Sequence, residues 1–447
     1  MKRALLRIAL LWLVVYGAAC SAPVDGPSIL LVTVDTLRAD ALGCYGAAPS
    51  VSPHLDRLAL RSTVFERAYA TAPITAPSHA SILTAQHPSS HGIVFNGHRV
   101  HAAIAERSRT VAEHLLELGY RTGAVISGGP LGDKFGFGRG FERKWRIKPA
   151  GLKELVDKGG EALRVSRTAA DWIDEQDGPW FLWVHYFDPH LPYQADPEVW
   201  SKVGPGGPRI SKYDVAETAI ERIRSGYRAE VFEVDRAIGA LLEHIDASTW
   251  RERTVIALTA DHGEYLGEHG RYGHQELYDE VLHVPMLLHE PGIRTPRRVS
   301  ATVSTIDLVP TLLAMLELPP LEHAQGRSLL PADQIAPRPV FAEWRSFDLA
   351  RANHPAMPSE FIVSVRDGRY AYIHDLFAPG SSQLFELSSD PDESRNVFAS
   401  LPQESARMQE LLTEHARDRL PDGRFSTAGI SVDRDSLEML RALGYLE

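Results

Sequence analysis

Three short segments of the 447-residue chain combine side chains that can ligate a metal ion with side chains that can attack or hold an ester. Asp35 lies in the segment VDTLRAD, Thr75 and His79 bound the segment TAPSH, and Asp261 and His262 lie in TADHGE. Alone, each segment has an ordinary explanation, because a strand-end aspartate often caps a helix and Ser, Thr and Pro are common in turns. Their joint occurrence in one chain indicates a functional site.

The acidic residues of this set follow runs of apolar residues. Asp35, Asp188 and Asp261 each come at or just after the end of a run that is typical of a strand buried on both faces. Because the carboxyl ends of parallel strands meet at one edge of a sheet, we expect the chemistry to lie at that edge. The three runs span residues 28–34, 180–187 and 254–259.

Helical patterns alternate with these runs, at residues 110–118 and 217–245, and a further strand is predicted at 123–127. This alternation predicts an α/β fold with a large, mostly parallel sheet sandwiched by helices. We expect a large domain over residues 28–320 and a smaller α+β domain over residues 321–447, where proline-rich sequence leads into shorter patterns. Those patterns predict strands at 340–344, 361–365 and 370–374 and a helix at 405–420.

Two further segments, DLVPTLL at residues 307–313 and LSSDPDE at 387–393, complete a series of motifs in a fixed order. With the three segments above, they resemble the sulfatase family of the alkaline-phosphatase superfamily, from Ile29 to nearly the end of the chain. The resemblance implies the α/β fold already expected, with a catalytic large domain. It also implies a metal-dependent hydrolase of anionic esters.

In that family, Asp35, Asp261 and His262 would ligate one divalent metal ion. Oxygen and imidazole ligands around an open position suit Ca²⁺, Mn²⁺, Mg²⁺ or Zn²⁺. Such an ion lowers the pKa of a bound hydroxyl and neutralises charge on the ester oxygens in the transition state.

Two histidines are candidate catalytic residues beside this ion. His190 resembles the family histidine that contacts the ester or the leaving group, and it is a candidate general acid. His274 stands where the family has a lysine. Together with Asp188, these histidines are alternatively candidates for holding a second metal ion, as in two-metal phosphodiesterases of the superfamily.

Thr75 stands at the nucleophile position of the family motif Cys/Ser-x-Pro-Ser-Arg. Sulfatases convert the Cys or Ser there to formylglycine, whose hydrate expels the sulfate by elimination from its second hydroxyl. Oxidation of threonine would give a ketone, and a threonine sulfate has no such exit. A phosphothreonine intermediate is instead opened by in-line attack of water or another alcohol. Thr75 therefore favours phosphoryl chemistry.

Other departures from the family pattern replace cations with neutral groups. His79 replaces the arginine of the motif, and Thr36 replaces the second aspartate of the usual pair. Imidazoles are neutral or partly charged near pH 7, so a phosphodiester or phosphonate monoester with one negative charge is served better than a phosphomonoester dianion. Asn96 resembles the oxygen-binding asparagine of phosphonate monoester hydrolases. His79 and Asn96 are therefore the candidate substrate-binding residues.

The leading functional hypothesis is a hydrolase, or a transferase to an alcohol, that acts on phosphodiester or phosphonate-type esters through Thr75. One alternative is a sulfuric ester hydrolase that works without formylglycine. Another is a non-catalytic lipoprotein that binds an anionic glycan or lipid headgroup. The formal net charge of −11 argues against nucleic acid as a partner. The expected partner is thus an anionic ester, on a small molecule, a glycan or a lipid headgroup.

The first twenty residues predict a signal peptide. A basic start and the apolar run 8–15 lead to small residues before Cys20, and the run is shorter than the roughly 20 residues that a membrane-spanning helix needs. The ending Ala-Ala-Cys resembles a bacterial lipobox with a lipidated cysteine. We expect an exported periplasmic or cell-envelope lipoprotein that meets the membrane only through this lipid anchor. Gly17 departs from the usual leucine, which leaves a soluble secreted product as the alternative.

Overall fold

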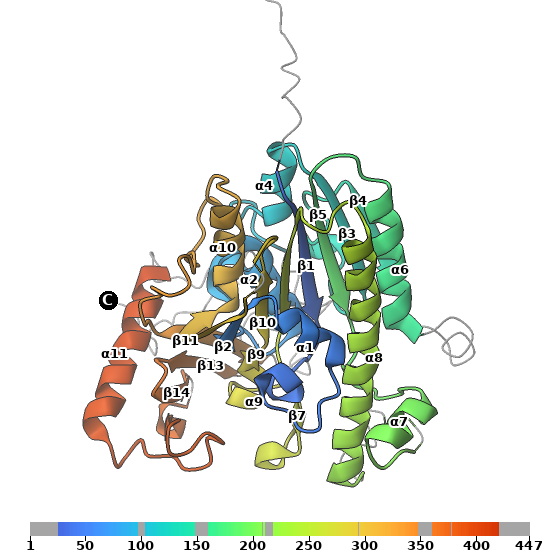
Figure 1. Ribbon diagram of the computed structural model, residues 1–447. Coiled ribbons are helices and arrows are strands. Elements are labelled where there is room, and N and C mark those ends of the chain that lie inside the picture. Colours follow the sequence, from blue (N-terminus) through green and yellow to red (C-terminus); the bar gives the residue numbers. More distant parts are fainter. Residues whose placement is uncertain are drawn as a thin grey trace, which may run out of the picture.

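The computed structural model describes most of the chain (Figure 1). The expected signal peptide and Cys20 lie outside the described residues. Within the described part, no helix is both long and apolar enough to pass through a lipid bilayer. The described residues are 26–96, 103–147, 160–207, 209–210, 218–293, 295–346, 360–376 and 378–419.

The main sheet has nine strands and is mostly parallel, as predicted. Eight strands follow the order β11-β2-β10-β6-β1-β5-β3-β4, and β9 pairs with β2. The pairs made by β10 and β9 are antiparallel, and all others in this sheet are parallel. The strands are β1 (Ser28–Val34), β2 (Thr63–Tyr69), β3 (Arg121–Ser127), β4 (Arg143–Ile147), β5 (Trp180–Tyr186), β6 (Thr254–Ala260), β9 (His283–Val284), β10 (Met286–His289) and β11 (Arg297–Ser304).

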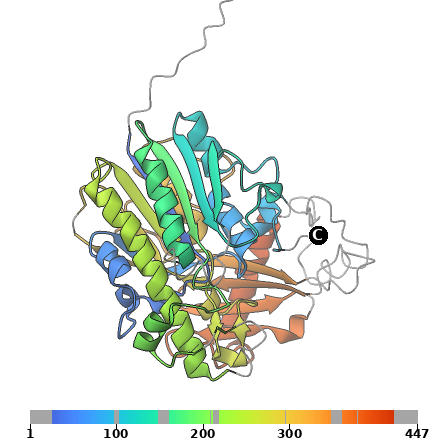
Figure 2. The same ribbon diagram turned by 90° about the vertical axis from the view of Figure 1, so that its right-hand side faces the viewer.

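Helices cover both faces of this sheet. Successive side chains of the central strand β1 point to opposite faces, and all of them are therefore buried. Leu30 and Val32 belong to the core formed with α1, α6 and α8, whereas Ile29 and Leu31 belong to the core formed with α2, α4 and α10 (Figures 1 and 2). The helices span α1 (Pro53–Ala59), α2 (Thr75–Thr84), α4 (Val111–Glu117), α6 (Gly160–Asp174), α8 (Ile220–Ala247) and α10 (Leu308–Met315). Shorter elements are α3 (Pro88–His91), α7 (Pro197–Val203), α9 (Asp279–Leu282), β7 (Tyr265–Leu266) and β8 (Tyr272–Gly273).

A small antiparallel sheet with one long helix forms the C-terminal part, as the sequence predicts. Met408 and Leu412 of the helix pack on Val365 and Tyr372 of the sheet. The boundary at residue 320 stays a prediction. The elements are β12 (Val340–Ser346), β13 (Glu360–Arg366), β14 (Tyr370–Asp375), β15 (Gln383–Glu386) and α11 (Pro402–Arg419).

The loop after β1 is held in an unusual conformation by helix α8. Thr36 has φ 53°, in the left-handed region that a β-branched residue rarely adopts. The Tyr227 hydroxyl, which reaches the loop from α8, donates to the Thr36 carbonyl at 2.8 Å and accepts from the Arg38 N–H at 2.9 Å. Tyr227 is buried, so both bonds are shielded from water. This hydroxyl therefore fixes the backbone directly next to Asp35.

We expect Tyr227→Phe to lower the free energy of unfolding by about 2 kcal/mol, because it leaves a buried carbonyl and a buried N–H without a partner. Urea unfolding followed by circular dichroism measures the change. Tyr120→Phe is the matched control, since the Tyr120 side chain is similarly buried and its hydroxyl donates to the Pro27 carbonyl at 3.2 Å, a longer bond than either bond of Tyr227. We expect the control to cost less than about 1 kcal/mol. Equal losses in the two variants would contradict this role for Tyr227.

Candidate active site

The register of the central strands places two aspartates side by side. Residues of β1 pair with residues of β6 up to Val34 and Ala260, so Asp35 and Asp261 follow the two strands at equivalent positions. Both aspartates are fully buried. The backbone N–H groups of Thr36 and His262 donate to Asp261 Oδ1 at 3.2 and 2.9 Å. The carboxylate edge predicted from the sequence is therefore present.

Buried polar atoms without a hydrogen-bond partner gather at this edge, among them both carboxylate oxygens of Asp35, Oδ2 of Asp261 and Nε2 of His262. His262 Nε2 lies 3.5 Å from Asp261 Oδ2 and 3.8 Å from Asp35 Oδ1. One ligand atom from each residue lies within 4.8 Å of the others. Buried polar atoms are normally satisfied, so this set fits a divalent ion held by the three residues expected as ligands.

The electrostatics of the three residues also fit an ion. Burial and the charge of Asp261 raise the pKa of Asp35 well above its usual range, and burial raises the pKa of Asp261 to about 6. Burial lowers the pKa of His262 to about 3, which keeps its ring neutral. The His262 Nδ1–H donates to the Gly263 carbonyl at 2.9 Å, so Nε2 carries the lone pair. Two buried carboxylates and a lone pair are stabilised together by a cation.

Thr75 is the first residue of helix α2 and is 2 % exposed. The sequence did not predict this helix. The carboxamide oxygen of Asn96 accepts from the Ala76 N–H at 2.8 Å and so satisfies a free N–H at the start of the helix. The positive end of the helix dipole favours negative charge at Thr75. Asn96 therefore lies beside the expected nucleophile, and its contact with substrate stays a prediction.

His79 lies behind Thr75 and is fully buried. Its Nδ1–H donates to the Thr75 carbonyl at 2.9 Å and is 3.5 Å from Asp261 Oδ2, while Nε2 is 3.1 Å from the Thr33 hydroxyl. Both ring nitrogens are thus engaged by protein atoms. The substrate-binding role expected for His79 stays a prediction, and its contacts indicate that it positions Thr75 against Asp261.

His190 and His274 lie next to each other beside His262. The ring centroids of His190 and His274 are 5.3 Å apart, and those of His262 and His274 are 4.3 Å apart. His274 Nδ1–H donates to the Pro73 carbonyl at 2.8 Å, and His190 Nδ1–H donates to the Leu191 carbonyl. Burial lowers the pKa of each ring to about 3, so both are neutral in the free protein with Nε2 as an acceptor.

Asp188 does not join these two histidines to form a set of three ligand atoms within 4.8 Å of one another in the described part of the chain. Burial and the nearby Glu161 raise the pKa of Asp188 to about 7. The second metal ion considered from the sequence therefore lacks a three-residue site in this structure. It stays a prediction without geometric support.

Two buried residues that the sequence analysis missed, Thr33 and His185, belong to this site. His185 Nε2 is 3.7 Å from Asp35 Oδ2, and His185 Nδ1 is 3.0 Å from the Thr33 hydroxyl. A histidine within an otherwise apolar strand, near the strand end, was the available signal. Glu264, which follows Gly263 in the segment TADHGE, accepts from the Tyr193 hydroxyl at 2.6 Å, and burial raises its pKa to about 8.

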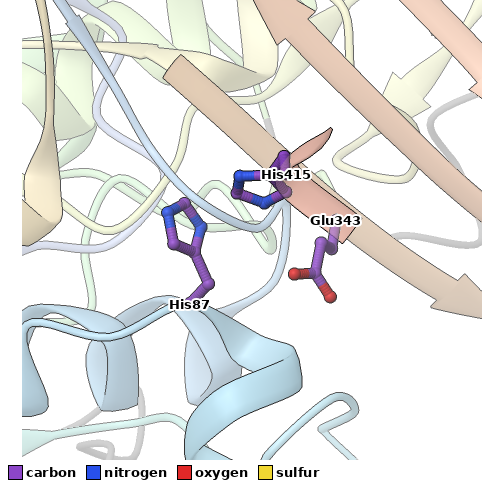
Figure 3. A group of neighbouring side chains, drawn as sticks. All are labelled: His87, Glu343 and His415. Atoms are coloured by element: carbon purple, nitrogen blue, oxygen red, sulfur yellow. The ribbon is translucent and has the colours of Figure 1, made fainter. Parts of the chain in front are cut away.

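A second group of candidate ligands, His87, Glu343 and His415, lies where β12 and α11 meet the loop before α3 (Figure 3). The two imidazole rings face the carboxylate, and their centroids are 4.8 Å apart. Glu343 already accepts from Ser89 at 2.8 Å and pairs with the Arg345 guanidinium at 3.4 Å. The positive charge of Arg345 opposes a cation here, so the group around Asp35 is the better candidate for a metal site.

We expect metal affinity to fall as the pH decreases from 8 to 5, because an ion binds the ionised carboxylates and protons compete for them. The pKa of Asp261, about 6, places its competition with protons within this range, and the raised pKa of Asp35 acts in the same direction. Each displaced proton weakens binding about tenfold per pH unit below the pKa. Isothermal titration calorimetry with Zn²⁺ or Mn²⁺ at several pH values measures the dependence. A dissociation constant that is flat over this range would contradict the assignment.

Comparison with known families covers most of the chain. The family described as Sulfatase matches residues 27–318, and the family described as N-sulphoglucosamine sulphohydrolase, C-terminal, matches residues 267–419. The ranges overlap, and together they span the main sheet and the C-terminal sheet.

Individual proteins agree with this match. A choline-sulfatase of Rhizobium meliloti is 27% identical over 83% of this chain and 82% of its own length. Arylsulfatase K of Gallus gallus is 32% identical, over 43% of this chain and 37% of that protein. A crystal structure of a phosphonate monoester hydrolase of Agrobacterium radiobacter has the same fold, with a TM-score of 0.71 and 22% identity over 88% of this chain and 96% of that chain. The chain therefore belongs to the sulfatase family of ester hydrolases.

Proposed function

We propose that this protein hydrolyses a singly charged ester of phosphorus, a phosphodiester or a phosphonate monoester, through the hydroxyl of Thr75. The observation that carries the proposal is the placement of Thr75 at the start of α2, tied through His79 to Asp261. The hydroxyl of threonine is a secondary alcohol, so its oxidation yields a ketone and not the aldehyde of formylglycine. The nucleophile is therefore the hydroxyl itself.

The fate of the intermediate favours phosphorus. Attack of Thr75 Oγ1 forms an O–P bond and breaks the bond from phosphorus to the leaving oxygen, which takes up a proton. Water then attacks phosphorus in line, the Thr75 O–P bond breaks, and Thr75 regains its proton. A threonine sulfate would have to be opened by direct attack of water on sulfur, because Thr75 has no second hydroxyl from which elimination could start.

His190 and His274 are the candidates for moving these protons. In the free protein each ring donates from Nδ1 to a carbonyl, which leaves Nε2 as a proton acceptor. A bound anion favours the protonated ring, so a histidine that has taken the Thr75 proton can return it to the leaving oxygen. A divalent ion held by Asp35, Asp261 and His262 would lower the pKa of the Thr75 hydroxyl and offset charge on the ester oxygens.

Neutral rings also limit the charge of the substrate. Burial lowers the pKa of His79, and burial lowers the pKa of His190 and His274 to about 3. Each stays uncharged before substrate binds. A dianionic phosphomonoester would need more positive charge than one divalent ion supplies next to two carboxylates. A monoanion fits this balance.

The second candidate is a sulfuric ester hydrolase, and the comparisons favour it over the phosphorus ester. The matching families and the relatives with a stated activity are mainly sulfatases, whereas the phosphonate monoester hydrolase shares the fold at 22% identity. A sulfate monoester also carries one negative charge, so the neutral histidines suit both candidates. The chemistry available to the Thr75 hydroxyl is therefore the feature that distinguishes the two candidates.

The test is hydrolysis of matched chromogenic esters: an aryl sulfate, an aryl phosphate, a phosphodiester and an aryl phosphonate monoester, each with Mn²⁺, Ca²⁺ or Zn²⁺. We expect the diester or the phosphonate to be turned over fastest. Thr75→Ala and Asp261→Asn should each reduce kcat/KM on the order of 10³-fold or more, because the nucleophile or a metal ligand is lost. Preferred cleavage of the sulfate would overturn the phosphorus assignment.

Two controls separate chemistry from folding. Thr75→Ser, with mass spectrometry to verify that the serine is not oxidised to formylglycine, keeps a hydroxyl and should retain more activity than Thr75→Ala. His289→Gln changes a buried histidine that donates from Nδ1 to the Arg61 carbonyl, away from the site, and should leave kcat/KM unchanged. Inactivity of the wild type on every ester would leave the non-catalytic binding protein as the better hypothesis.

We also propose that the protein works in the cell envelope, anchored by a lipid on Cys20. The supporting feature is the lipobox-like Ala-Ala-Cys that follows the apolar run in the first twenty residues. Metabolic labelling with a radioactive fatty acid in a bacterial host should mark the wild type and not Cys20→Ser. Labelling of neither protein, with both released in soluble form, would favour the secreted alternative.

A further inference from the structure

Thr33 and His185 form a hydrogen-bonded pair beneath the metal-binding carboxylates. They are register partners on the parallel strands β1 and β5, and both are fully buried. Their side chains meet on the sheet face that α2 covers, because the Thr33 hydroxyl also contacts His79 of that helix at 3.1 Å. The hydrogen-bond pattern at this hydroxyl determines which nitrogen of His185 carries its hydrogen.

Three side-chain nitrogens surround the Thr33 oxygen. Trp183 Nε1 lies at 2.9 Å, His185 Nδ1 at 3.0 Å and His79 Nε2 at 3.1 Å. A hydroxyl has one hydrogen to donate and two lone pairs to accept with. Indole nitrogen only donates, so Trp183 occupies one lone pair. One histidine therefore accepts the Thr33 hydrogen, and the other donates to the second lone pair.

His79 is the one that accepts. Its Nδ1 lies 2.9 Å from the Thr75 carbonyl, which can only accept, so the hydrogen of the neutral ring is on Nδ1. Nε2 of His79 then carries a lone pair and takes the hydrogen of Thr33. His185 must donate from Nδ1 to Thr33, and its Nε2 carries the lone pair.

That lone pair is directed at a carboxylate. His185 Nε2 is buried, has no hydrogen-bond partner and lies 3.7 Å from Asp35 Oδ2. His262 has the same arrangement on the other oxygen: Nδ1–H donates to the Gly263 carbonyl, and Nε2 lies 3.8 Å from Asp35 Oδ1. A lone pair facing a carboxylate is repulsive unless a cation lies between them. Histidines that ligate metal ions typically donate their other N–H to an outer partner in this way.

We propose that His185 is a further ligand of the divalent ion held by Asp35, Asp261 and His262, and that Thr33 orients it. An ion held by Asp35 would draw Nε2 of His262 and Nε2 of His185 toward it, because each of these atoms faces one oxygen of Asp35. Ligand atoms about 2.1 Å from an ion at tetrahedral angles are about 3.4 Å apart, close to the 3.7 and 3.8 Å observed around Asp35. His185 is not part of the three-residue group whose ligand atoms all lie within 4.8 Å of one another, so its ring must move closer to the other ligands when an ion binds.

The donor set has a consequence for the identity of the ion. Two imidazoles with two carboxylates suit Zn²⁺ or another transition metal, whereas Mg²⁺ and Ca²⁺ prefer oxygen ligands alone. We expect Zn²⁺ to bind more tightly than Mg²⁺ or Ca²⁺, by at least about 100-fold. The proposal rests on the metal site of the proposed function and not on which ester is cleaved.

The experiment compares metal binding by the metal-free wild type, His185→Asn and His185→Gln, with Zn²⁺ measured by competition with a chromogenic chelator. The asparagine amide reaches only as far as Nδ1, so it keeps the bond to Thr33 and removes the ligand atom. We expect His185→Asn to raise the dissociation constant for Zn²⁺ at least about 10-fold, and His185→Gln to raise it less. Thr33→Val should also weaken binding, by about 10- to 100-fold.

The absorption spectrum of the Co²⁺-loaded protein gives a second readout, because its visible bands change when an imidazole ligand is lost. His289→Gln, a buried histidine outside the site, should alter neither the affinity nor the spectrum. An affinity within about threefold of wild type and an unchanged Co²⁺ spectrum in His185→Asn would overturn the proposal. Absence of metal binding by the wild type would overturn it too. Since no ester is present, the result is separate from the substrate assay.

Discussion

The register between β1 and β6 sets two carboxylates, Asp35 and Asp261, next to each other where water does not reach. Burial removes their hydration, and each negative charge opposes ionisation of the other. Such a pair is stable only if it holds protons or if a cation lies beside it. The ends of β1 and β6 hold the two carboxylates in place, and Tyr227 fixes the loop that follows Asp35.

The histidines around the carboxylates do not supply the missing positive charge. His262, His190 and His274 each give their Nδ1 hydrogen to a backbone carbonyl, and burial holds each ring neutral. A neutral ring with this tautomer offers a lone pair, which ligates a metal or accepts a proton. These histidines therefore offer acceptors and no fixed positive charge, which fits the binding of a divalent ion by the carboxylates.

The sequence predicted the strands that carry Asp35 and Asp261, because long apolar runs end at these residues and parallel strands align their carboxyl ends. It could not place His185, since the pairing of this residue with Thr33 depends on the register between strands about 150 positions apart. The sequence also could not predict the contacts that His79 makes in the folded protein. The motif position indicated substrate contact, but the burial of the ring under α2 is a property of tertiary packing.

The choice between sulfur and phosphorus depends on how the covalent intermediate leaves Thr75. The backbone around this side chain accommodates a branched residue: Gly129 has φ 58°, and a Cβ there would lie 3.3 Å from the Thr75 methyl group. The methyl group of Thr75 also stands where a formylglycine hydrate would carry its second hydroxyl. With one oxygen on its Cβ, Thr75 cannot expel a bound sulfate by elimination, whereas in-line attack of water at phosphorus needs only that oxygen as leaving group. The family relationship thus establishes the fold and the class of hydrolysis, whereas the preference for a phosphorus ester rests on the proposed role of this one side chain.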